Sequence, residues 1–402
     1  MSPPLQEGLA RLGTWMPFAR AAAELAYFTR APVSESTAGR LAEAAGAASV
    51  AEQTAEVERL ERERPPAPAG PPVQQVSADG ALVPLVGGEW AGVKTVAIGT
   101  VESTVGADGR PAVHAQDLSY FARLADAATF SRLALGELHR RGTATAGVVV
   151  APMDGAEWEQ GFLDLHRPDA IRILDFPHAV EHLSAAAQAT FGVGTEAGAA
   201  WLAAQAHTLQ HAGDGAAAVL AALRALPVAA ATDPAAAAAA RDATVGYVER
   251  RLDQMRYAAF RAQGYPIGSG SVESANKLVV EARLKGSGMR WARAHVNPLV
   301  ALRTVACAER WAEAWPHIEQ QLRAQARQQG RPRQQARRAA RPPARPSAPP
   351  RRCPAPRPAP PARPPRIVDG RPTADHPWKK WPLLAGGRRA LATRPAPAGP
   401  KL

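Results

Sequence analysis

Three acidic residues, far apart in the sequence, stand where a sheet and a helix could bring their carboxylates together. Asp79 and Asp154 each follow an apolar run typical of a strand, and each precedes a glycine. Glu273 lies in a Gly/Ser-rich stretch that leads into a helical pattern. If both strands end at one edge of a sheet, the three acids form a cluster. Carboxylate oxygens suit Mg²⁺ or Mn²⁺, and two such ions can activate a water or a 3′-hydroxyl for attack on a phosphodiester.

These acids also have purely structural interpretations. Asp-Gly is ordinary turn chemistry. Glu273 in a first helical turn complements the helix dipole, and Ser271 is the predicted N-cap. The basic residues that follow within a few turns favour a phosphate-binding site over a simple helix start. These residues, which we expect to neutralise phosphates, are Arg283, Lys285, Arg290 and Arg293.

Two histidines form a weaker candidate site. His178 and His182 are spaced i, i+4 on one predicted helical face, with Asp175 nearby, which suits Zn²⁺. The sequence offers no third ligand of equal quality, so we favour polar residues that line the edge of an active site. No phosphate loop, nucleophile elbow or Cys/His dyad stands out. Two cysteines, Cys307 and Cys353, are too few for a disulfide framework.

The positive charge of the chain is confined to its C-terminal end. The net charge is +12, yet residues 331–402 hold 18 Lys and Arg against two acids, and residues 1–330 are slightly acidic. Residues 331–370 contain thirteen Pro and eleven Arg, a composition that cannot bury a core. We therefore predict a disordered, polyanion-binding tail over residues 328–402. The sequence shows neither a membrane span nor a signal peptide, which predicts a cytoplasmic protein.

The hydrophobic pattern predicts an α/β fold. Residues 1–64 are predicted to be helical, with a possible helix-turn-helix whose second helix ends at Gly46, and residues 65–72 form a Pro-rich linker. A mixed sheet flanked by helices should occupy residues 73–183, a helical insertion 184–262, and the last core helices 263–327. The expected strands are 73–79, 82–90, 92–101, 145–153 and 170–175, with a turn at Gly87-Gly88 and helices over 119–138 and 156–166.

Four motifs resemble bacterial insertion-sequence transposases of the DDE type, in the Kra insertion-sequence group, which is distantly similar to Mutator-type transposases. The resemblance spans roughly residues 73–315. The motifs are Asp154-Gly-Ala-Glu-Trp, Ile173-Leu-Asp-Phe-Pro-His-Ala-Val-Glu-His-Leu, Gly268-Ser-Gly-Ser-Val-Glu-Ser-Ala-Asn and Arg283-Leu-Lys-Gly-Ser-Gly-Met-Arg-Trp.

This resemblance implies a ribonuclease-H-like core with Mg²⁺ or Mn²⁺ held by Asp79, Asp154 and Glu273. Asp175 is the rival for the second acid, and His178 would line the site. It also implies double-stranded DNA, as element ends and target, as the partner of a homo-oligomer associated with the nucleoid. The N-terminal region is short for the group, so we expect a missing upstream segment that could impair end recognition.

Two other functions remain open at this stage. The chain could be a catalytically silent or truncated transposase remnant that only binds DNA. It could also be another ribonuclease-H-like nuclease, which would cleave RNA–DNA hybrids or junctions without strand transfer. An active transposase nicks DNA in the presence of metal, whereas the DNA-binding remnant does not. An active transposase also carries out strand transfer, whereas the nuclease does not.

Overall fold

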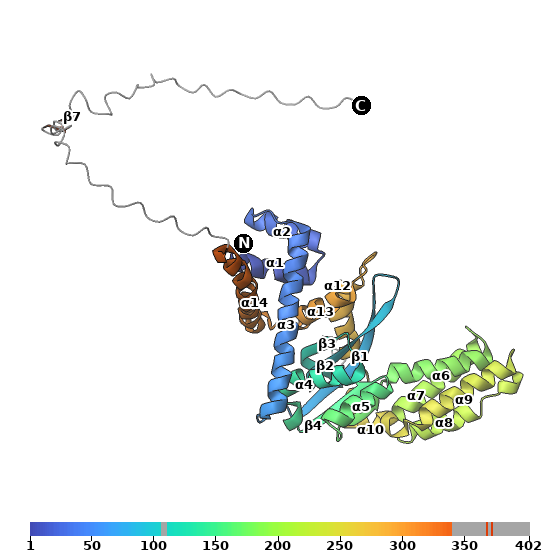
Figure 1. Cartoon of the computed structure of the whole chain (residues 1–402). Coiled ribbons are helices and arrows are strands. Elements are labelled where there is room, and N and C mark those ends of the chain that lie inside the picture. The colour runs from blue at the N-terminus through green and yellow to red at the C-terminus, as the bar shows by residue number, and fades with distance from the viewer. Residues whose placement is uncertain (106–110, 340–366, 369–370, 373–402) are drawn as a thin grey trace, which may run out of the picture. The chain divides into compact units, whose positions relative to one another are not determined.

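The computed structural model describes residues 1–105, 111–339, 367–368 and 371–372. Residues Met1–Ala336 form one compact unit, and Arg337–Leu402 form a second. The first unit is an α/β fold built around a five-stranded mixed sheet (Figure 1).

The sheet has the strand order β3-β2-β1-β4-β5. Strand β2 pairs antiparallel with both β1 and β3, whereas β4 pairs parallel with both β1 and β5. β1 is thus the central strand. The strands are β1 (Val73–Pro84), β2 (Trp90–Val105), β3 (Pro111–Arg123), β4 (Val148–Met153) and β5 (Ile171–Leu174).

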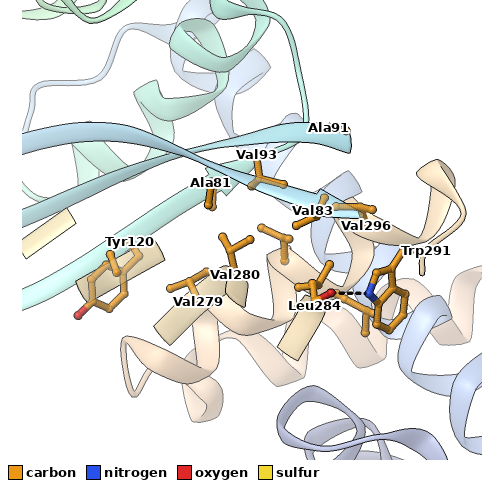
Figure 2. Packing of buried hydrophobic residues seen from close by; sticks show 14 of the residues in the cluster. Ala81, Val83, Ala91, Val93, Tyr120, Val279, Val280, Leu284, Trp291 and Val296 are labelled. Atoms are coloured by element: carbon orange, nitrogen blue, oxygen red, sulfur yellow. Dashed lines mark hydrogen bonds between the residues drawn. The ribbon is translucent and has the colours of Figure 1, made fainter. Parts of the chain in front are cut away.

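Both faces of the sheet bury apolar side chains under helices. On one face, β1 and β2 pack against the last core helices, and Val83 and Val93 meet Val280 in a cluster that also contains Trp291 (Figure 2). The Trp291 indole donates a hydrogen bond to the Leu284 carbonyl at 3.0 Å. The other face packs on α4 (Ala127–Arg140) and α5 (Glu157–His166). Alternate residues of β1 therefore face different layers.

Two predicted boundaries in the sheet are wrong. The chain does not turn at Asp79-Gly80: β1 continues to Pro84, and Asp79 pairs with Thr95 in the middle of the strand. The turn comes instead at Gly87 and Gly88, which have φ of 95° and 90°, as predicted. β3 lies partly in the stretch predicted as the helix 119–138, which begins only at Ala127, where Asp126 caps α4.

The N-terminal helices differ from the predicted helix-turn-helix. α1 (Pro3–Trp15), α2 (Phe18–Thr29) and α3 (Glu35–Glu63) lie in the same compact unit as the sheet. α3 does not end at Gly46 but runs 17 residues further. A Cβ at Gly46 would lie 2.1 Å from the Pro298 carbonyl oxygen of α13 (Arg293–Cys307). Gly46 therefore permits close packing of two helices and does not end one.

The predicted insertion is helical throughout most of its length. It comprises α6 (Phe176–Phe191), α7 (Glu196–His211), α8 (Gly215–Arg224), α9 (Pro234–Glu249) and α10 (Tyr257–Ala262). These helices share one hydrophobic core with Val150 of β4 and with Ile173 and Leu174 of β5. α9 starts with the Asp233 side chain accepting a hydrogen bond from the Ala236 N–H and with proline in its first turn.

The predicted tail is only partly within the described residues. α14 (Trp311–Ala339) continues past residue 328, where we expected order to end. The short strands β6 (Ile367–Val368) and β7 (Arg371–Pro372) pair with each other, and residues 340–366, 369–370 and 373–402 lie outside the described part. None of the described helices is both long enough and apolar enough to traverse a membrane.

Candidate metal centre

Three carboxylates meet where β1, β4 and α5 come together. Oxygens of Asp79, Asp154 and Glu159 all lie within 4.8 Å of one another. Among the described residues, this is the only group of three acidic, histidine or cysteine side chains placed to hold one metal ion. The structure thus brings together two of the three predicted acids, and its third member is Glu159, which the sequence analysis did not select.

Asp79 points from the central strand toward the helix layer that carries Glu273. Its Oδ1 accepts a hydrogen bond from the Gly80 N–H at 2.6 Å, and its Oδ2 accepts one from Asn276 Nδ2 at 2.8 Å. Burial raises the pKa of Asp79, and the nearby Asp154 charge adds to that rise, whereas the hydrogen bond from Gly80 opposes it. The carboxylate is held in one orientation with its charge only partly compensated.

Asp154 follows β4 in a tight turn that the helical insertion supports. The Tyr247 hydroxyl donates to the Asp154 carbonyl at 2.9 Å, and Arg251 Nη2 donates to the Gly155 carbonyl at 2.7 Å. The Asp154 Oδ1 accepts from the Ala156 N–H at 2.8 Å. The insertion, although remote in sequence, therefore fixes the backbone that presents the second acid.

Glu159 sits in the first turn of α5 and is fully buried. One carboxyl oxygen accepts from the Gly155 N–H at 3.2 Å, and the other has no hydrogen-bond partner. Burial, together with the Asp154 charge, raises the pKa of Glu159 to about 10. A carboxyl group in this setting holds a proton at neutral pH unless a cation takes the proton's place.

Glu273 and Asp175 lie beside the cluster and outside it. α11 (Gly270–Ala275) carries Glu273 with an exposed side chain, whose Oε1 accepts from the Ser269 hydroxyl at 2.9 Å. Asp175 caps α6 and binds the Ser269 N–H at 2.6 Å. Asp175 therefore anchors the loop that leads to Glu273. Ser269 precedes α11, and the predicted cap Ser271 instead accepts a hydrogen bond from Gln75 Nε2.

The four predicted phosphate-binding cations differ in exposure. Arg290 and Arg293 are exposed, and neither forms an ion pair within the part of the chain that the structure describes. Lys285 pairs with Glu281 at 2.5 Å. Arg283 is only 2% exposed, and its guanidinium contacts the rings of both Phe18 and Trp291, so its prediction as a phosphate ligand is wrong.

The histidines make no metal site in the described structure. His182 stacks on Tyr247 with ring centroids 3.7 Å apart, and His178 lies 5.0 Å from His182 in an edge-on arrangement. His178 Nδ1 is 3.5 Å from a carboxylate oxygen of Glu181. Both rings pack near the residue that holds the Asp154 turn.

The donor set of the cluster fits a hard divalent cation. All three side chains offer oxygen, the choice of Mg²⁺ and Mn²⁺. Two oxygens on one Mg²⁺ are at most about 4.2 Å apart, so a small side-chain movement closes the cluster. Two buried oxygens here lack a partner, one on Glu159 and one on Asn276, whose Nδ2 binds Asp79. A bound cation with its waters would satisfy such atoms.

The turn after Asp154 requires glycine. Gly155 has φ of 86°, and a Cβ there would lie 2.6 Å from Arg251 Nε and 3.0 Å from Leu174 Cδ1. Gly194 has φ of 72° and nothing within 4 Å of a Cβ. We expect Gly155→Ala to reduce the free energy of unfolding by about 1–3 kcal/mol more than Gly194→Ala does.

Chemical denaturation of both variants measures this difference. Gly194→Ala is the matched control, since it carries the cost of the left-handed backbone without the clash. Equal losses in the two variants would mean that Arg251 moves freely and does not support the turn.

Comparison with protein-family models found no match, and comparison with curated proteins found no significant one.

Proposed function

We propose that the protein is a metal-dependent DNA transposase of the DDE type, working on DNA in the cytoplasm. The observation that carries this proposal is the cluster itself: Asp79 on the central strand and Asp154 after the adjacent parallel strand, with oxygens within 4.8 Å. The strand order β3-β2-β1-β4-β5, with β2 antiparallel, is consistent with the ribonuclease-H-like core that the motifs imply.

Each residue of the site has a separate role in phosphodiester cleavage. Asp79 and Asp154 would hold Mg²⁺ or Mn²⁺, and Glu159 would offer a third oxygen. When bound, the cation would lower the pKa of water and polarise a phosphoryl oxygen. Asn276 orients Asp79 through its amide. Tyr247 and Arg251 hold the backbone of the Asp154 turn, so Asp154 keeps its position when the negatively charged DNA strand binds.

Glu273 lies outside the cluster that the other acids form. In this proposal, it joins them only when DNA and metal are bound. Its exposed carboxylate accepts a hydrogen bond from the Ser269 hydroxyl and from no other side chain in the described part of the protein. Its charge already reaches Asp79, where it contributes to the raised pKa. A rotation about its side-chain bonds can move it toward the cluster when DNA and metal are both bound. Arg290 and Arg293 supply free positive charge for the DNA phosphates.

The test is processing of DNA taken from either side of the encoding gene, with Mg²⁺ and a target plasmid. We expect cleavage at a repeat boundary, followed by joining of the freed 3′ end to the target. Ca²⁺ in place of Mg²⁺ is the control for binding without chemistry. Cleavage of RNA–DNA hybrid with no joining would identify a nuclease instead. Binding without any cleavage would identify a DNA-binding remnant.

A further inference from the structure

The helix that carries Glu273 changes its hydrogen-bonding pattern directly beside Asp79. After α11 it becomes a π-helical stretch, η4 (Asn276–Glu281), and then continues as α12 (Ala282–Leu284). π-helical turns are rare in proteins, and those that occur are often found at functional sites. Asn276 is the first residue of η4, and its side-chain amide donates to Asp79. The placement of η4 therefore decides where Asp79 is held.

Arg303, on α13, binds the backbone of this π-helical stretch. Its Nε donates to the Val279 carbonyl at 3.2 Å, and its Nη2 donates to the Leu278 carbonyl. The side chain is 1% exposed and has no carboxylate partner among the described residues. A buried guanidinium that binds only carbonyls is costly unless those bonds are well placed. Arg303 thus depends on the shape of η4, and η4 on Arg303.

The C-terminal end of α1 completes the environment of this arginine. Arg303 Nη1 donates to the Thr14 carbonyl at 3.3 Å, and Arg283 Nε donates to the Gly13 carbonyl at 3.0 Å. Carbonyls at the end of a helix lack intrahelical partners and carry the negative end of its dipole, which stabilises cations. The Trp15 ring also lies 4.5 Å from the Arg303 guanidinium. Helix α1 therefore takes the place that an acidic partner would otherwise occupy.

We propose that Arg303 is a positioning residue for the metal centre. It joins η4 to the C-terminal end of α1 and so keeps Asn276 against Asp79. The N-terminal helices are then part of what shapes the site, and a change in them alters the geometry of the first acid. This inference depends on the proposed function for its metal, but the contacts that carry it do not.

The experiment uses the full chain with Arg303→Lys, which retains the charge and loses the forked geometry. Arg123→Lys is the matched control, because Arg123 is 2% exposed and donates to Gln53 Oε1 on α3. In hydrogen exchange without metal, we expect Arg303→Lys to speed exchange about tenfold in η4 and at the end of α1 together. Arg123→Lys should leave both segments at the rate of the unsubstituted protein.

Calorimetric titration with Mn²⁺ supplies the second readout. Asn276→Ala and Arg303→Lys should each weaken Mn²⁺ binding about tenfold, as loss of a ligand-orienting contact does. The double variant should be no weaker than Asn276→Ala alone, because both changes act on Asp79 through one contact. Unchanged Mn²⁺ affinity in Arg303→Lys, whatever its melting temperature, would overturn the inference.

The two proposals fail in different ways. If the unsubstituted protein binds no Mn²⁺, the proposed function fails, and the exchange measurement still decides the role of Arg303. Faster exchange confined to η4 and α1 then supports the structural link, whereas unchanged or uniformly faster exchange contradicts it.

Discussion

Asp154→Asn should lower Mg²⁺-dependent cleavage by about 10³-fold, because loss of a metal-binding carboxylate removes several kcal/mol of charge stabilisation. Asp79→Asn should have a similar effect, since both side chains belong to the one cluster. Initial rates of nicking on a labelled DNA fragment measure the loss. Asp242→Asn is the control, because that aspartate is exposed on α9 and pairs with the neighbouring Arg241.

Glu273→Gln should lower cleavage as strongly and yet leave the Mn²⁺ affinity of the DNA-free protein unchanged. The reason is that Glu273 lies outside the cluster, which Asp79, Asp154 and Glu159 form without it. Calorimetry and nicking rates on the same preparations separate binding from chemistry. Full activity in Asp154→Asn would remove the second acid from the mechanism, and full activity in Glu273→Gln would remove the third.

The stability of the metal-free protein should depend on pH through Glu159. Its pKa in the folded state is about 10, far above its ordinary value of 4.5. The folded state therefore retains a proton that the unfolded state has lost between these pH values. The stabilisation that the proton on Glu159 gives the folded state is fully present below about pH 4.5. It falls as the pH rises toward 10, by up to about 1.4 kcal/mol per pH unit.

Glu159→Gln isolates this effect, because glutamine keeps the shape and cannot ionise. With EDTA present, the variant should gain stability relative to the unsubstituted protein as pH rises from 5 to 9, which urea unfolding at each pH measures. Mg²⁺ should restore the unsubstituted protein at high pH, where the ionised carboxylate can bind it. A difference between the two proteins that does not vary with pH would show that Glu159 stays ionised in the fold.

The sequence was informative where local chemistry and tertiary context agree. Gly87-Gly88 makes the predicted hairpin turn, and Asp154 ends an apolar strand as predicted. The same logic failed at Asp79-Gly80, where the turn signal lies within a strand that has partners on both sides. Strand pairing overrode the turn preference, which no local pattern reveals.

Other failures have different physical causes. The sequence did not predict β3, because Phe121 and Leu124 also match a helical spacing. The N-terminal half of β3 also contains many polar residues. Glu159 could have been found, since it lies three and four residues before the buried Phe162 and Leu163 and so shares their helical face. The burial of Arg283 could not have been predicted from the sequence, because its partners on α1 and α2 are about 270 residues away.

The contacts around Asp79 also determine when the site forms during synthesis. Asp79 and its partner Asn276 are separated by 197 residues, and Thr14 and Arg303 by 289. At bacterial to eukaryotic translation rates of about 5–20 residues per second, Asp79 waits about 10–40 s for the amide that orients it. A nascent chain thus carries two of its acids long before they are aligned. The metal centre matures only once nearly all of the first compact unit has left the ribosome.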